Sequence, residues 1–319
     1  MKEEYEIVEH SQIEDMNVFL VEMTYRLPHM HREFEICMVL SGEVDIYTGR
    51  DTYRFRRGEM MILNPRQTHE IHALTENSLI LSFQAASGLF NRIYPDIKNL
   101  WFEDVRIEDF DGGLFKSRLL ELSLAYLRKD AGYEFFCMAD FAWVFGSLLV
   151  NSRWHLISEK ERVDNATKSE RLRRLLDYIE ENFSGKLLLS DLAESEGVSM
   201  YYLSHFFKEM LGMPFQDYLA VTRFEKARRL VEHTDMSLTE ISLECGFSDY
   251  RYLNKIYQKQ LGYTPKDYRK SHEASGTDIS SKGADPFNTQ RFCTEQESIE
   301  IIEIAFEKYK VPRQDALQK

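Results

Sequence analysis

Two stretches in the second half of this 319-residue chain repeat one pattern. The first, EGVSMYYLSHFFKEMLGMPFQDYL, begins at Glu196, and the second, CGFSDYRYLNKIYQKQLGYTPKDYR, begins at Cys245. Each follows a short amphipathic helix that ends at a glycine, the residue that most readily adopts positive φ. A serine aligned in the two copies, Ser199 or Ser248, is a good N-cap for the next helix. The repeat therefore predicts two copies of a helix, a tight turn and a second helix.

This layout is that of a helix-turn-helix, whose second helix enters the DNA major groove with its exposed face. Apolar spacing predicts the buried face of each second helix: Leu203, Phe206, Phe207 and Met210, then Leu253, Ile256, Tyr257 and Leu261. The other face carries the candidate DNA-binding residues Tyr201, Ser204, His205, Lys208, Tyr250, Arg251, Asn254 and Lys255, with Gln258 beside them. Arg and Lys can bond guanine edges, and Asn and Gln can pair with adenine. A merely solvated helix face is the alternative, which two matching copies disfavour.

The segment between the copies, PFQDYLAVTRFEKARRLVEH, predicts one long helix. Its buried stripe is expected at Tyr218, Val221, Phe224, Ala227 and Leu230 or Val231. Such a helix is about 30 Å long, close to the roughly 34 Å of one DNA turn. It can therefore place both second helices in successive major grooves on one face of the DNA.

The first half of the chain has other periods. Residues 16–84 show short alternating runs broken by Gly, Pro, Asn and Asp, which indicates an antiparallel β-barrel or sandwich. Residues 113–155 show a helical period, with Phe115, Leu119, Leu122 and Tyr126 on one face of the first of two helices. The stretch SEKERVDNATKSE at 158–170 is polar and aperiodic, as a linker between domains is.

Charge is unevenly distributed. The chain carries a net charge of −13, yet the 16 Lys and Arg of residues 168–271 balance 16 Asp and Glu. An acidic protein binds DNA only weakly without sequence specificity, because Lys and Arg supply the phosphate contacts. DNA binding is therefore expected to be local and strongly dependent on salt.

Several classes are disfavoured. The apolar run FAWVFGSLLV is shorter than the roughly 20 residues of a membrane helix, and the acidic start MKEEYEIVEH lacks the form of a signal peptide. A cytoplasmic location without membrane contact is therefore expected. The four cysteines are far apart, which predicts neither a zinc site nor a disulfide framework. Nothing resembles a phosphate-binding loop or a nucleophile motif.

The stretch MSLTEISLECGFSDYRYLNKIYQKQLGYTPKDYR resembles the signature of the AraC/XylS family of transcription regulators, through GFSD, LGYTP and the closing YR. The sequence departs from it at Ser242, Tyr257 and Gln258, where that family usually has Ala, Phe and Lys. The resemblance implies contact with double-stranded DNA through Tyr201, Ser204, His205, Tyr250, Arg251, Asn254 and Lys255. It also implies a homodimer, through the helices of 113–155, and contact with RNA polymerase.

The segment PHMHREFEICMVLSGEVDIYTGRDTYRFRRGEMMILNPRQTH resembles the cupin-type sensor of the same family. In metal-dependent cupins the residues matching His29, His31, Glu35 and His69 bind a divalent metal, for which imidazole and carboxylate are suited. The segment before His69 lacks a glycine and one residue of the enzyme motif. The resemblance therefore implies that these four residues bind a small-molecule effector, a sugar or related metabolite, with no catalytic residue, metal or cofactor. A metal-binding or enzymatic cupin fused to a DNA-binding module is the alternative.

The predicted fold is an α+β multidomain protein with an N-terminal cupin-like β-barrel and a C-terminal all-α double helix-turn-helix. Its domains are an effector-binding domain in 1–112, a helical dimerisation segment in 113–157, a linker in 158–170, the DNA-binding domain in 171–271, and a linker with a helical extension in 272–319. In the extension, a Thr294/Glu297 capping box opens a helix with Ile299, Ile302, Phe306 and Tyr309 on one stripe. It docks either on this protein or on a partner.

Overall fold

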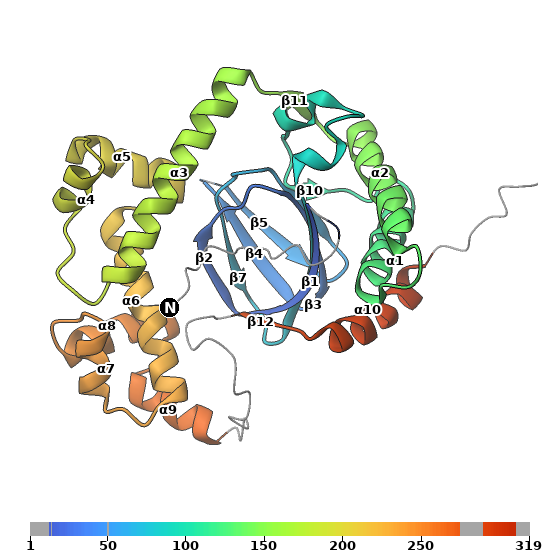
Figure 1. The fold of residues 1–319 in the computed structure, drawn as a ribbon. Coiled ribbons are helices and arrows are strands. Elements are labelled where there is room, and N and C mark those ends of the chain that lie inside the picture. The colour runs from blue at the N-terminus through green and yellow to red at the C-terminus, as the bar shows by residue number, and fades with distance from the viewer. Residues whose placement is uncertain (1–12, 14, 50, 275–289, 311–319) are drawn as a thin grey trace, which may run out of the picture. The chain divides into compact units, whose positions relative to one another are not determined.

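The computed structural model describes residues 13–274 and 290–310, apart from residues 14 and 50. These residues divide into two compact units. The sheet unit contains residues 13–166 and 290–310, and the helical unit contains residues 167–274 (Figure 1). Most of the linker predicted within 272–319 lies outside the described residues.

The sheet unit contains two larger antiparallel sheets. Six strands follow the order β10-β6-β3-β8-β1-β12: β10 (Arg106–Ile107), β6 (Met60–Leu63), β3 (Phe34–Ser41), β8 (Ser78–Ala85), β1 (Met16–Met23) and β12 (Gln290–Phe292). Four strands follow the order β2-β7-β4-β5: β2 (Tyr25–His29), β7 (His69–Ala73), β4 (Glu43–Thr48) and β5 (Asp51–Arg56). A small pair joins β9 (Leu100–Phe102) to β11 (Trp154–Leu156).

The prediction of a closed barrel is wrong for this structure. Within the described residues, the two larger sheets face one another as separate layers, and no strand pairing joins them. The outer edge of β1 is occupied by β12 from the C-terminal extension, with Val21 opposite Phe292 and Met23 opposite Gln290. Because a strand edge can hold only one neighbour, residues Val21–Met23 of β1 cannot also pair with the second sheet.

Strand β3 separates two hydrophobic layers. Successive side chains of a strand point to opposite faces. Phe34, Ile36 and Met38 belong to the core beneath the helices, whereas Cys37 and Val39 belong to the core between the sheets. The same alternation places Glu35 between the sheets, which is the basis of the polar cluster described below.

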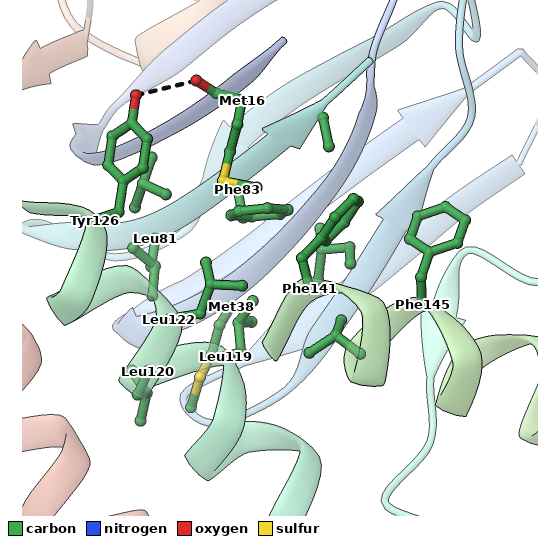
Figure 2. Close-up of a cluster of buried hydrophobic side chains, with 14 of the residues drawn as sticks. Met16, Met38, Leu81, Phe83, Leu119, Leu120, Leu122, Tyr126, Phe141 and Phe145 are labelled. Atoms are coloured by element: carbon green, nitrogen blue, oxygen red, sulfur yellow. Dashed lines mark hydrogen bonds between the residues drawn. The ribbon is translucent and has the colours of Figure 1, made fainter. Parts of the chain in front are cut away.

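Three helices cover the outer face of the six-stranded sheet: α1 (Leu114–Arg128), α2 (Tyr133–Asn151) and α10 (Glu295–Tyr309) (Figure 1). The predicted face of α1 is confirmed, since Phe115, Leu119, Leu122 and Tyr126 are at most 3% exposed. Figure 2 shows the leucines of α1 and Phe141 of α2 against Phe83 of β8, with the Tyr126 hydroxyl donating to the Met16 carbonyl at 3.0 Å. Two short 3₁₀ turns, Ser87–Phe90 and Pro95–Asn99, complete this layer.

Helix α2 is the one described helix that is long and apolar enough to span a membrane by length and composition. Core helices of soluble proteins pass the same test. Its Phe141, Val144, Phe145 and Leu148 pack in the sheet unit's core, so its apolar character is explained in part by that packing.

The segment 158–170, predicted to be a linker without a period, is helical from residue 159, because it forms the first half of α3 (Glu159–Asn182). Ser158 and Glu161 form reciprocal hydrogen bonds, in which the Ser158 backbone N–H donates to the Glu161 carboxylate at 2.7 Å and the Glu161 N–H donates to the Ser158 hydroxyl at 3.1 Å. An i,i+3 ion pair joins Arg162 to Glu159. Capping and ion pairs stabilise a helix without an apolar period, so the polar composition did not reveal this helix.

The helical unit continues through α4 (Leu189–Ser195), α5 (Met200–Leu211), α6 (Phe215–His233), α7 (Leu238–Glu244), α8 (Tyr250–Leu261) and α9 (Pro265–Ala274). The long connecting helix predicted between the two copies is α6. Of its predicted stripe, Tyr218, Phe224, Ala227 and Val231 are buried, whereas Val221 and Leu230 are half-buried.

Two hydroxyls are buried in this unit without a hydrogen-bond partner among the described residues: Ser242 Oγ and Tyr257 Oη, both on residues with 0% exposure. Both lie at positions where the sequence departs from the family pattern. A buried polar group without a partner costs about 1–3 kcal/mol of stability.

We therefore predict that Ser242→Ala raises the free energy of unfolding of the helical unit by about 1 kcal/mol or more, because it removes an unsatisfied hydroxyl and leaves only a small void. Chemical denaturation followed by far-UV circular dichroism measures the change. Thr222→Val is the control, because the buried Thr222 hydroxyl donates to the Tyr218 carbonyl at 3.0 Å; it should give no gain. A loss of stability in Ser242→Ala would contradict the assignment.

Candidate DNA-binding surface and sensor site

The first helix-turn-helix consists of α4 and α5. Gly197 lies in the turn with φ +63°, and the Ser199 side chain caps α5 by accepting from the Tyr202 N–H at 3.1 Å. The inward face contains Leu203, Phe206 and Phe207, all at most 2% exposed. The predicted turn glycine and serine cap are therefore present in this copy, and the predicted buried face is confirmed except at Met210, which is half-buried.

The second helix-turn-helix consists of α7 and α8, and its turn is more constrained. Gly246 has φ +74°, and a Cβ there would lie 2.6 Å from the Ser184 carbonyl oxygen, so only glycine fits. The predicted serine cap of α8 is wrong, because Asp249 caps this helix by accepting from the N–H groups of Arg251 and Tyr252. The one-residue insertion in this copy moves the cap from Ser248 to the aspartate.

The candidate DNA-binding residues are distributed over the solvent side of both helices. Tyr201, His205, Lys208, Arg251 and Lys255 are exposed, and Ser204, Tyr250 and Asn254 are half-buried. The Tyr201 and His205 rings contact edge to face at 4.4 Å between centroids. The Arg251 side chain is 90% exposed and bonds to Asp249 at 3.0 Å. Each helix therefore presents a polar face beside its buried one.

The sensor residues gather between the two sheets of the other unit. His31, Glu35 and His69 are 7%, 4% and 1% exposed, and one ligand atom of each lies within 4.8 Å of the others. His31 Nε2 lies 2.8 Å from Glu35 Oε2, and His69 Nε2 lies 3.7 Å from the same oxygen. His29 stands beside this group, with its ring centroid 4.1 Å from that of His69.

Backbone carbonyls orient these imidazoles. His31 Nδ1 lies 3.0 Å from the Glu33 carbonyl oxygen, and His69 Nδ1 lies 2.9 Å from that of Gln67. A carbonyl oxygen only accepts, so each Nδ1 carries a hydrogen. His31 Nε2 faces the Glu35 carboxylate at 2.8 Å, so in an ion pair with Glu35 this ring donates from both nitrogens. His69 Nε2 is buried and has no hydrogen-bond partner among the described residues.

The protonation states follow from burial and charge. Burial opposes ionisation of Glu35, but the charge and hydrogen bond of His31, helped by His69, hold the Glu35 pKa at about 2. Burial, and next the charge of His31, lowers the pKa of His69 to about 4, although Glu35 opposes this shift. At neutral pH the cluster therefore contains an ionised Glu35 carboxylate beside a neutral His69 imidazole.

Sequence reasoning missed Gln84 in this cluster. This side chain is 1% exposed, and its Nε2 donates to Glu35 Oε1 at 3.4 Å. Ser82, two residues earlier, lies on the same face and bonds to Cys37 at 3.2 Å. Polar residues alternating with Leu81 and Phe83 in the apolar run SLILSFQ were the signal that could have found both.

The donor set also fits a divalent cation. Two imidazole nitrogens and one carboxylate, His31, His69 and Glu35, are suited to a first-row transition metal, and the unpartnered His69 Nε2 is a free ligand atom. Such an ion would replace the proton on His31 Nε2 and would supply a Lewis-acidic centre. The third histidine of the cluster, His29, is not one of these three candidate metal ligands.

Comparison with known proteins finds a match for each of the two units. A family model described as a helix-turn-helix domain matches residues 192–271, and one described as an AraC-like ligand binding domain matches residues 22–82. The uncharacterised HTH-type transcriptional regulator YfiF of Bacillus subtilis is 26% identical over 256 residues, which are 78% of this chain and 80% of that protein.

Two further similarities are partial. The HTH-type regulator SAR0107 of Staphylococcus aureus is 25% identical over 247 residues, which are 73% of this chain and 31% of that longer protein. The solved C-terminal domain of the response regulator yesN from Fusobacterium nucleatum is 38% identical, with a TM-score of 0.31, and the match covers 31% of this chain and 98% of that one.

Fold and matches together define a DNA-binding transcription regulator with a ligand-binding domain. The two matched regions, residues 22–82 and 192–271, are those of AraC-type helix-turn-helix transcriptional regulators with an N-terminal ligand-binding domain. Its relatives are regulators and not enzymes, in agreement with the prediction that the chain has no catalytic function. The helix-turn-helix region binds DNA, and the ligand-binding domain implies a small-molecule effector.

The buried His69 of the sensor cluster predicts how the stability of the sheet unit depends on pH. In the folded state His69 stays neutral down to about pH 4, whereas in the unfolded state it takes up a proton below about 6.5. Stability from His69 is therefore present above pH 6.5 and is lost as the pH falls toward 4. His69→Gln should remove this part of the acid destabilisation.

Denaturation of chelator-treated protein between neutral pH and pH 4 measures the difference. All three tryptophans, Trp101, Trp143 and Trp154, belong to the sheet unit, so tryptophan fluorescence reports on that unit. The exposed His155→Gln is the control and should keep the wild-type dependence. If the free energy of unfolding changed with pH in the same way in wild type and in His69→Gln, the lowered pKa of His69 would be the wrong explanation.

Proposed function

We propose that this regulator reads DNA with α5 and α8 in successive major grooves and that its sheet unit binds a small polar effector at the histidine cluster. The observation that carries the proposal is the duplicated helix-turn-helix, with a polar face exposed on both second helices. In both copies the opposite face is packed with apolar side chains, so the polar face is the one available to DNA.

The two reading helices differ in chemistry. Copy two offers Arg251, Lys255 and Asn254, whereas copy one offers Tyr201, Ser204 and His205 with the more distant Lys208. Charged side chains give phosphate and guanine contacts, and these are the strongest terms in DNA affinity. We therefore assign to copy two the larger electrostatic contribution to DNA affinity. The contribution of copy one depends more on the shape of the DNA.

Replacing Arg251 by Ala should weaken binding to the specific site by about 1–3 kcal/mol and relax specificity at one base pair, if the guanidinium reads a guanine. In the free protein this group bonds Asp249, a contact that DNA would replace. Gel-shift titration against a selected operator and single-base variants measures both effects. The exposed Arg57→Ala of the sheet unit is the control. Unchanged affinity and specificity in Arg251→Ala would exclude this role.

The effector proposal rests on the buried polar cluster. His29, His31, Glu35 and His69 are proposed to bond the effector, and a hydroxyl-rich sugar or related metabolite supplies matching donors and acceptors. The unpartnered His69 Nε2 needs a donor, which a hydroxyl group would provide. The same atom favours a divalent metal as the second candidate, so the two have to be separated by experiment.

We predict that purified protein, dialysed against chelator, holds no stoichiometric metal and binds one member of a sugar panel by calorimetry. His69→Ala should abolish that binding, whereas His155→Ala should not, because His155 lies outside the cluster. Stoichiometric metal retained through dialysis, together with no sugar binding, would replace the effector interpretation with the metal-binding one.

A homodimer through α2 is the proposed assembly. Phe135, Ala139, Ala142, Gly146 and Val150 are exposed and lie at spacings of three or four residues, so they form one apolar stripe. Phe135 is 81% and Val150 83% exposed. Exposed apolar surface of this kind marks an interaction site, and the small residues at its centre allow another helix to approach closely.

Phe135→Glu should convert a wild-type dimer at about 10 µM into a monomer, because it buries a charge in an apolar interface. Light scattering measures the mass. Ile93→Glu, at a residue 78% exposed but off the stripe, is the control and should remain dimeric. A wild-type monomer at this concentration, or a dimeric Phe135→Glu, would contradict the proposal.

A cytoplasmic location and contact with RNA polymerase follow from the proposed function and stay predictions.

A further inference from the structure

The chain returns to the sheet unit after the helical unit. Strand β12 pairs with β1, the Cys293 N–H donates to the Leu20 carbonyl at 2.9 Å, and Phe292 contacts Phe19 edge to face at 5.4 Å between ring centroids. Figure 1 shows this late segment beside the earliest described strand. Backbone pairing and a ring contact together anchor the strand.

Helix α10 is anchored by burial. Ile302 is 0% and Ala305 7% exposed, and both belong to the core that α1 and the six-stranded sheet share. At its N-terminus the predicted capping box forms between Thr294 and Glu297. Burying an isoleucine side chain of this kind contributes about 1.5–3 kcal/mol.

Charged and close contacts surround this core. Arg291 bonds both Glu22 of β1 at 2.8 Å and Glu297 of α10 at 3.2 Å, which couples strand and helix. Lys129 at the end of α1 bonds Glu295 at 2.7 Å. At the other end of α10, the Tyr309 hydroxyl lies 2.5 Å from where a Cβ of Gly58 would stand. Helix α10 is therefore fitted to the sheet unit over its whole length.

The helical unit, residues 167–274, is thus connected to the sheet unit at both ends. Helix α3 runs into it on one side, and residues 275–289 lead from it to β12 on the other. A chain of about 15 residues spans at most about 50 Å. A body held by two connections of limited length has less freedom to rotate than a body held by one.

We infer that residues 290–309 form a latch that tethers the C-terminal end of the helical unit to the sheet unit, so that two chain connections limit the motion of the DNA-binding helices. A role of the latch in regulating DNA binding rests on the proposed function. A change in the sheet unit at β1 or α1 would reach the helical unit from its C-terminal side as well as through α3.

The first test asks whether the latch is held by its own contacts. A protease recognition sequence is inserted within 275–289 of the full chain, and the purified protein is cut there. The cleaved C-terminal piece should co-elute with the remainder in gel filtration. Ile302→Asp should lose the piece, and Ile304→Asp, on the same helix at 71% exposure, should keep it. Release of the piece from the chain with no substitution would overturn the inference.

The second test measures the restraint. A fluorescence donor at the exposed Glu76 of the sheet unit and an acceptor at the exposed Lys259 of the helical unit report their distance distribution, with labelled chains diluted in unlabelled ones. Cutting within 275–289, or Ile302→Asp without cutting, should broaden the distribution, whereas Ile304→Asp should not. An unchanged breadth after cutting would overturn the latch. Neither readout involves DNA, so failure of the proposed DNA-binding function would not affect this result.

Discussion

Packing of both helix-turn-helix copies onto α6 is the constraint on which the proposed DNA-reading surface depends. In the first copy Phe207 contacts Phe215 at 5.4 Å, and in the second Tyr257 contacts Phe224 at 5.1 Å, each edge to face between ring centroids. Aromatic pairs of this geometry add about 0.5–1.5 kcal/mol beyond their burial. Because both pairs stand on one rigid helix, the spacing of α5 and α8 is set before DNA is met.

The sequence predicts local features of the structure well. The turn at Gly197, the cap at Ser199 and the buried face at Leu203 follow from dihedral freedom and helical period, which neighbouring residues determine. The pairing of β12 with β1 joins residues more than two hundred positions apart, and no periodic signal marks such a partner. That pairing also occupies Val21–Met23 at the edge of the six-stranded sheet, which a closed barrel would need for pairing with the other sheet.

The sensor site shows a similar division. The spacing of His31 and Glu35 on entering β3, with His69 at the start of β7, was enough to expect a polar cluster. The sequence could not show that Glu35 is ionised while His69 is neutral, because both states depend on burial and on the charges that the fold brings beside each group. In α2 the abundance of aromatic residues hid the distinction between buried Phe141 and exposed Phe135, since a helix apolar on several faces has no single period.

The central claim is that each protomer reads two successive major grooves. Methylation interference on an operator selected from random DNA tests it most directly. For each bound protomer, modified guanines should interfere in two clusters about 10 base pairs apart on one face of the duplex. Asn254→Ala should weaken one cluster and His205→Ala the other. Interference confined to one groove segment, or loss of the same cluster in both variants, would contradict the account.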